Sequence, residues 1–481
     1  MDFFTLNPIE IFDNLPNAGN PFSAMFLIIA NGGWIAILFA CLWGGWIGYL
    51  EYIRNKFNSQ QEEILLAIDI PKANEQSPKA VEHIFSNLYG IIKKGNLIER
   101  YKYGYNQWCL SLEIVSIEGY IQFLIYTPKQ FRDLVEAAIY AQYPEAEITE
   151  VEDYVDLIPK PLEFPHPVWD LWGSEFHLAK PDPYPLRTWP FFEHSLSQVF
   201  MDPMASLLEI MSRMGPGEHL WLQIIIAPAD SGWKKKGEAL INQLIGKKTP
   251  AKSNGDWMYF PREIGKGLQE SITASIIPPT DMEGPNAKKT GEREWPSMMQ
   301  HLSPAEREIV EAVGMKISKL GFLSKIRFIY AAKKDVLHKP KGVEAIKGAL
   351  MQFNTQNLNA LTIDYYTRTK IDYFFIKSRT LARKRRILWN YRYRSLKRGR
   401  RKYILNIEEL ASLWHFPISE VVKVPSVQTV AAKKGSAPVG TPYYQDKISN
   451  RNVDNFTNTN ESGVGTSTNS KNSPPINLPF S

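Results

Sequence analysis

The alternation of apolar and polar residues between Glu62 and Tyr154 predicts a compact unit of strands and helices. The segments "EEILLAIDIP" and "WCLSLEIVSIEGYIQFLIYTP" have the pattern of strands, and the Glu-Gly break in the second is typical of a hairpin. The segments "SPKAVEHIFSNLYGII" and "KQFRDLVEAAIYAQYP" have apolar residues at helical spacing, and "AEITEVEDYV" closes the unit as a strand. This order, β-α-β-β-α-β, predicts a ferredoxin-like α+β domain over residues 60–156.

The pattern is less regular over residues 157–420, where we expect a second α+β region. A proline-rich connector with one strand near Glu175–Leu178 precedes a helix and a strongly apolar strand in "DPMASLLEIMSRMGPGEHLWLQIIIAPAD". Residues 247–296 are polar and weakly periodic, which predicts a long loop. A capping box at Ser303 and Glu306 then begins a helix–strand–helix–strand series ending in the strand "KIDYFFIKS". That order is compatible with a second ferredoxin-like unit.

The segment "PFSAMFLIIANGGWIAILFACLWGGWIGYL" contains no charged residue and predicts one N-terminal transmembrane helix over residues 23–50. About 20 apolar residues are enough to cross a bilayer as a helix. Arg54 and Lys56 follow this segment and no Lys or Arg precedes it. The positive-inside rule therefore places residues 1–22 outside a bacterial inner membrane and the bulk of the chain in the cytoplasm.

Small residues recur at every fourth position of this segment, at Ala40, Gly44 and Gly48. Such spacing lets two membrane helices approach closely, which would make the chain a homo-oligomer. The alternative is that glycines are merely tolerated in a single helix. At the other end of the chain, residues 421–481 are rich in Asn, Ser and Thr and poor in large apolar residues, which predicts a disordered tail.

Composition argues against most enzyme classes. The chain has 481 residues, a net charge of +6, and two cysteines, which is too few for a disulfide framework or a cysteine-based zinc site. The eight histidines contain no zinc-binding spacing, and no P-loop is present because neither Gly-Lys pair has the required flanking residues. The adjacent carboxylates Glu408 and Glu409 are expected to be solvated charges. We expect no enzymatic activity, no cofactor and no metal.

The segment "RKRRILWNYRYRSLKRGRRK" is the strongest local feature, and we expect it to belong to a basic helix over residues 379–402. Its basic side chains can contact a phosphate backbone while the interleaved Trp and Tyr stack on unpaired bases. They can also contact anionic lipid. A third interpretation is a solvated helix whose Leu381, Leu388 and Tyr391 pack inward. The candidate binding residues are Arg383, Lys384, Arg385, Arg386, Arg392, Arg394, Lys397, Arg398, Arg400, Arg401 and Lys402.

Four segments carry a family resemblance: "YILNIEELASLWHFP", "KIDYFFIKSR", "LLAIDIPKANEQSP" and "EAAIYAQYPEAEITEVEDY". Together they resemble the membrane-proximal, non-ATPase region of large proteins from uncultured small-genome bacteria, over about residues 20 to 440. In those proteins this region precedes a HerA/FtsK-type DNA-translocating ATPase, similar to the coupling ATPases of conjugation and type IV secretion. Here "APVGTP" is followed by the low-complexity tail and no motor. The resemblance therefore implies a separate ATPase as partner.

Two functions remain open at this point. The first is a non-enzymatic, single-pass membrane platform of a conjugation or type IV secretion-like apparatus that contacts nucleic acid, a motor ATPase or both. The second is a membrane scaffold that binds only proteins and anionic lipid.

Overall fold

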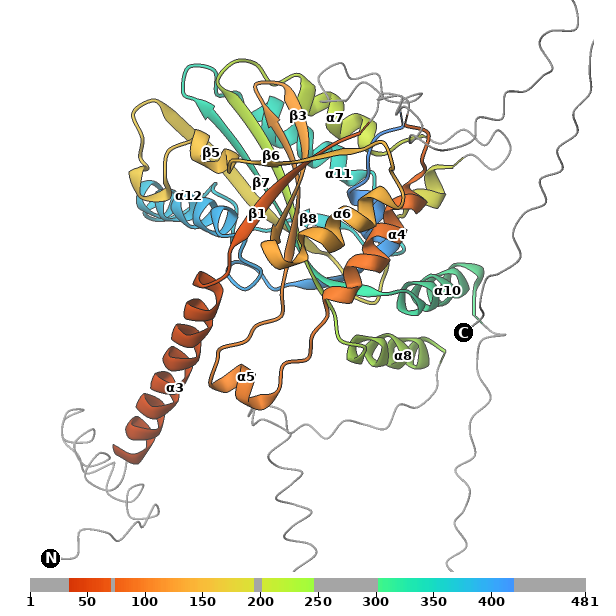
Figure 1. The fold of residues 1–481 in the computed structure, drawn as a ribbon, viewed down its shortest axis with the longest axis horizontal. Helices are drawn as coiled ribbons and strands as arrows, with labels where there is room; N and C mark the ends of the chain where they lie inside the picture. The colour runs from red at the N-terminus through yellow and green to blue at the C-terminus, as the bar shows by residue number, and fades with distance from the viewer. Residues whose placement is uncertain (1–33, 71–73, 194–200, 246–301, 419–481) are drawn as a thin grey trace, which may run out of the picture. The chain divides into compact units, whose positions relative to one another are not determined.

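The computed structural model describes residues 34–70, 74–193, 201–245 and 302–418 (Figure 1). The nine strands of these residues form one antiparallel sheet in the order β4-β1-β3-β2-β6-β7-β5-β8, and β9 pairs with β7. The expected α+β class is confirmed. Strands β2 and β6 pair at the middle of the sheet, where Ile114 lies opposite Leu222.

The first four strands have the succession β1-α4-β2-β3-α6-β4, which is that of a ferredoxin-like unit. Glu118 and Gly119, both with positive φ, form the two-residue turn between β2 and β3, at the break that the sequence indicates. The elements are β1 (Glu63–Asp69), α4 (Pro78–Leu88), α5 (Leu97–Tyr101), β2 (Leu110–Ile117), β3 (Tyr120–Pro128), α6 (Arg132–Tyr140) and β4 (Glu147–Val151).

The next four strands repeat this arrangement. Their order in the sheet, β8-β5-β7-β6, corresponds to β4-β1-β3-β2 position by position. Helices α8 and α10 lie between β6 and β7, at the position that the two-residue turn between β2 and β3 occupies in the first half. The second half therefore has a long insertion between these two paired strands. The elements are β5 (Trp169–Leu178), α7 (Met204–Ser212), β6 (Glu218–Pro228), α8 (Gly232–Leu244), α10 (Pro304–Ser318), β7 (Gly321–Lys333), α11 (Ala345–Met351) and β8 (Leu361–Ile363).

Both faces of the sheet are covered. Alternate residues of each strand point to opposite faces. Leu222 belongs to the face that is covered by α4, α6, α7 and α11. Trp221 belongs to the other face, which is covered by the basic helix α12 (Ile376–Arg392) (Figure 1). The contacts of α12 come from Ile387, Leu388 and Tyr391. After α12 the chain continues into β9 (Tyr403–Asn406) and α13 (Ile407–Leu413). The basic segment therefore belongs to the core of the fold.

The expected transmembrane helix over residues 23–50 is wrong for the part of the chain that is described. Helix α3 (Trp34–Ser59) is the element at this position, and none of the described helices is both long and apolar enough to cross a membrane. The uncharged part of α3 begins at Trp34 and ends at Leu50, after which Glu51, Arg54 and Lys56 follow. Within the described residues that part is shorter than the roughly 20 apolar residues that a span requires, and residues 23–33 of the expected span lie outside them. Ala40, Gly44 and Gly48 lie in α3 and are exposed.

Two further predictions are corrected by the structure. The basic helix ends at Arg392, because the chain turns there through Arg394 and Gly399, which both have positive φ. The expected strand "KIDYFFIKS" is instead a loop followed by the first three residues of α12, with Phe374 and Phe375 in left-handed backbone conformations that no strand contains. Three further expected segments lie outside the described residues: the N-terminal segment 1–22, the loop 247–296 and the tail 421–481.

Candidate nucleic-acid interface

A row of four polar side chains crosses the sheet beneath α12. Glu113 on β2 lies opposite Gln223 on β6, which lies opposite Arg327 on β7, which in turn lies opposite Glu175 on β5. All four side chains are fully buried. Gln223 donates to Glu113 at 2.8 Å, and Nη1 of Arg327 donates to Gln223 at 3.2 Å. The row passes from one ferredoxin-like half to the other. Because it contains two carboxylates and only one guanidinium, it needs further positive charge from a segment above the sheet.

Arg394 supplies that charge at the β2 end of the row. Its Nε lies 3.1 Å from Oε1 of Glu113, and its Nη1 lies 2.5 Å from Oδ2 of Asp153. Burial would lower the pKa of Arg394, but Glu113 and Asp153 raise it well above the ordinary value. Tyr154 also donates to Glu113, at 2.8 Å. Because a buried carboxylate is stable only when it is paired and hydrogen-bonded, Arg394 has a structural role.

The loop after α12 folds onto the other end of the row. The backbone N–H of Arg400 donates to Glu175 at 2.5 Å, and Gly399, with φ of +98°, lies against the same carboxylate. Lys325 on β7 donates to the carbonyl oxygen of Arg398 at 2.8 Å. Burial lowers the pKa of Lys325 to about 8, although Glu175 opposes this shift. The carboxylate and the buried lysine thus fix the position of residues 398–400.

Other members of the basic segment bind carbonyl oxygens or acids of the protein itself. Arg385 donates to the carbonyl of Phe164 at 2.8 Å, and Arg383 donates to the carbonyl of Arg368 at 3.0 Å. Lys384 pairs with Asp170, and Arg392 pairs with Asp156. Six of the eleven candidate residues therefore have partners within the fold: Arg383, Lys384, Arg385, Arg392, Arg394 and Arg400.

The remaining five candidates have exposed side chains that form no ion pair with the described residues. They are Arg386, Lys397, Arg398, Arg401 and Lys402. Burial of part of the side chain and the nearby Arg54 lower the pKa of Lys397. Arg386 comes from the outer side of α12, whereas the other four come from the loop before β9. Of these five, Arg386 and Arg398 line one hollow together.

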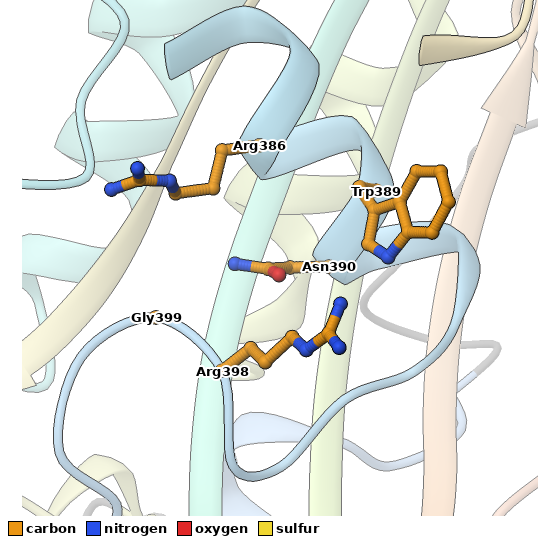
Figure 2. A pocket seen from close by; sticks show the side chains of 5 residues that line it. All are labelled: Arg386, Trp389, Asn390, Arg398 and Gly399. Atoms are coloured by element: carbon orange, nitrogen blue, oxygen red, sulfur yellow. The ribbon is translucent and has the colours of Figure 1, made fainter. Parts of the chain in front are cut away.

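Arg386 and Arg398 line a hollow of about 420 Å³ together with Trp389, Asn390 and Gly399. Figure 2 shows the Arg398 side chain extending toward the Trp389 ring, whereas Arg386 extends to the other side of Asn390. The centroid of the Trp389 ring also lies 4.7 Å from the ring centroid of Tyr393, whose side chain is largely exposed. An indole with a guanidinium group beside it can contact a planar, apolar ring and the anionic groups attached to it.

Sequence reasoning did not identify the buried row under this surface. Its signal was nevertheless present, because Lys325 and Arg327 stand two positions apart in the apolar strand "FLSKIRFIYAAK", and Glu113 interrupts "LSLEIVSI". Residues two apart in a strand share a face. A charged residue on an otherwise apolar strand therefore indicates a buried partner, and the basic segment was the one source of sufficient positive charge.

Other candidate groups have structural roles. Glu409, expected to be solvated, is fully buried and lies 3.0 Å from Lys316, so that expectation is wrong. Burial raises the pKa of Glu409, although Lys316 opposes the shift. Nε2 of His415 lies 3.0 Å from Asp202. No group of His, Cys, Asp and Glu within the described ranges could hold a metal ion.

Comparison with curated proteins gives no match. One family model, described as "Domain of unknown function (DUF8128)", matches residues 70–429, which begin directly after β1 and include the rest of both ferredoxin-like halves, α12 and the loop before β9. The chain therefore belongs to the DUF8128 family.

Proposed function

We propose that this protein binds single-stranded nucleic acid on the surface formed by α12 and the loop before β9. The observation that carries the proposal is the hollow that Arg386, Arg398 and Trp389 line together. Proteins that bind single strands combine a positively charged path for the phosphates with aromatic side chains on which bases stack. Both parts are present here, within one small surface.

The burial of the other basic residues supports the proposal. A solvated helix would leave most of its charges exposed, whereas this fold gives six of the eleven residues internal partners and leaves five exposed, two of which line one hollow. Lys397, Arg401 and Lys402 are also exposed and lie on the same loop as Arg398. An extended anionic chain can therefore follow the loop while one base contacts Trp389.

The proposal is tested by fluorescence anisotropy with a labelled single-stranded oligonucleotide and the full chain, at several salt concentrations. We expect Arg386→Gln combined with Arg398→Gln to weaken binding about ten-fold or more. The slope of log affinity against log salt should fall by about 1.4, since each phosphate contact to a single strand contributes about 0.7.

The matched control is Arg307→Gln. Arg307 is an exposed arginine of α10 that pairs with Glu311, and it lies outside the basic surface. This variant should bind the oligonucleotide like the unaltered chain. The proposal is overturned if the unaltered chain shows no salt-sensitive binding, or if the double variant binds as well as the control does. The motor ATPase and the translocation apparatus that the resemblance implies stay predictions.

A further inference from the structure

The end of the loop before α12 and the first residue of that helix expose four consecutive apolar residues. Tyr373, Phe374, Phe375 and Ile376 have exposed fractions of 68, 80, 83 and 51 %. They form a protruding tip rather than a lining of the Trp389 hollow, to which none of them contributes. A contiguous group of large apolar side chains in water is characteristic of a surface that contacts a partner or a membrane.

The fold holds this tip in its exposed form. Phe374 and Phe375 have φ of +44° and +48°, a left-handed conformation that is disfavoured for residues with a Cβ atom. Nη1 of Arg379 donates to the carbonyl oxygens of Tyr373 at 2.9 Å and Phe374 at 3.3 Å. The backbone N–H of Arg379 donates to the carbonyl of Phe375 at 3.0 Å. The first turn of α12 therefore maintains a conformation in which both rings point away from the core.

The charges beside the tip are positive. Lys370, Lys377 and Arg379 are exposed and flank the four apolar residues on both sides. The nearest acid in sequence is Asp372, which lies 2.6 Å from Arg368 and 3.7 Å from Lys370. Aromatic rings with adjacent Lys and Arg are typical of protein segments that lie at the interface of an anionic bilayer.

We propose that the tip formed by Tyr373–Ile376 inserts into the interfacial layer of an anionic lipid bilayer. The Phe374 and Phe375 rings enter the boundary between headgroups and acyl chains, while Lys370, Lys377 and Arg379 contact lipid phosphates. Stacking on nucleobases fits this tip less well, because Ile376 has no aromatic face and the two phenylalanines have no polar group. Insertion of a loop tip requires no membrane-spanning helix, and the site is separate from the Trp389 hollow.

The test is co-sedimentation of the full chain with vesicles of phosphatidylcholine, with and without added phosphatidylserine, at sub-saturating lipid. The variant Phe374→Asn combined with Phe375→Asn removes both rings, and Asn tolerates the left-handed backbone. The control is Tyr120→Asn, which removes another largely exposed aromatic ring, from the start of β3. The exposed apolar residues of α3 are the same in all three proteins, so any binding that they cause is common to them.

We expect the double variant to bind the phosphatidylserine vesicles about ten-fold more weakly than the unaltered chain, with the Tyr120→Asn control unchanged. Binding of the unaltered chain should also weaken in vesicles of phosphatidylcholine alone. Equal binding by the double variant and the control overturns the proposal, and so does an absence of vesicle binding by the unaltered chain. Loss of oligonucleotide binding by the double variant, with vesicle binding retained, would assign the tip to nucleic acid instead.

Discussion

Arg394 and Glu113 form a buried ion pair that joins the end of the basic segment to the middle of the sheet. Their side chains are 4 and 0 % exposed, and Nε of Arg394 lies 3.1 Å from Oε1 of Glu113. Glu113 lies on β2 in the first ferredoxin-like half, whereas Arg394 follows α12, beyond the end of the second half. This pair shows that part of the basic segment stabilises the fold instead of presenting charge to a ligand.

Arg394→Met is expected to lower the free energy of unfolding by about 3–5 kcal/mol, because it leaves the Glu113 carboxylate buried without its partner. Urea unfolding measures this change. The matched control is Arg392→Met, which removes a partly exposed pair with Asp156. Exposed pairs contribute only about 0–1 kcal/mol, so the control should differ little from the unaltered chain. Equal effects of the two substitutions would contradict the role assigned to Arg394.

Gly399→Ala is expected to destabilise the loop before β9. A Cβ atom at this position would overlap the Glu175 carboxylate, and the φ of +98° is one that L side chains rarely adopt. We expect a loss of about 1–3 kcal/mol in thermal or urea unfolding, together with weaker oligonucleotide binding. Gly314→Ala is the control, because a Cβ there has no atom within 4 Å and Gly314 lies inside helix α10. That substitution should stabilise the protein by about 0.5–1 kcal/mol.

Lys325 gives a prediction for alkaline pH. Its pKa falls from 10.5 to about 8 in the folded chain, so the unfolded chain binds more protons between these values. Buried, charged Lys325 therefore lowers the free energy of unfolding by its full amount below about pH 8. This destabilisation diminishes as the pH rises toward 10.5. Glu175, Arg327 and Lys402 are the charged groups that influence this site.

Lys325→Met removes this titration. We expect the stability of the unaltered chain, measured relative to Lys325→Met by urea unfolding, to increase between pH 7.5 and 9.5. The comparison cancels the contribution of the buried tyrosines, which titrate in both proteins. A difference that stays constant with pH would show that Lys325 has an ordinary pKa.

Asp202 gives the corresponding prediction for acid. Burial alone would raise its pKa, but His415 and the N–H groups of Met204 and Ile418 hold it below the ordinary value of 3.8. The stability that the carboxylate contributes is therefore fully present above about pH 3.8 and is lost as the pH falls through the lower, folded-state pKa. Asp202→Asn should be less stable than the unaltered chain at pH 6, and the difference should shrink below pH 3.8. An unchanged difference down to pH 2 would contradict this assignment.

Some elements of the fold could be predicted from local sequence alone. The capping box at Ser303 and Glu306 begins α10 as expected, and the Glu118–Gly119 turn lies where the pattern breaks. The strand prediction for "KIDYFFIKS" was wrong because its aromatic residues, which favour strands, are exposed at a tip that Arg379 holds. A contact with a helix that follows in the chain overrode the local preference.

The sequence by itself determined the α+β class, the order of strands and helices in the first half, and the presence of a positively charged segment with interleaved aromatic residues. These follow from side-chain periodicity and from capping and turn residues, which act over a few positions. Only the tertiary structure decided that the two halves join through β2 and β6. It also decided that Arg394 forms a buried ion pair with Glu113, whereas Arg386 and Arg398 remain exposed. Strand pairing and ion pairing depend on distances between residues far apart in the chain, and local sequence does not contain those distances.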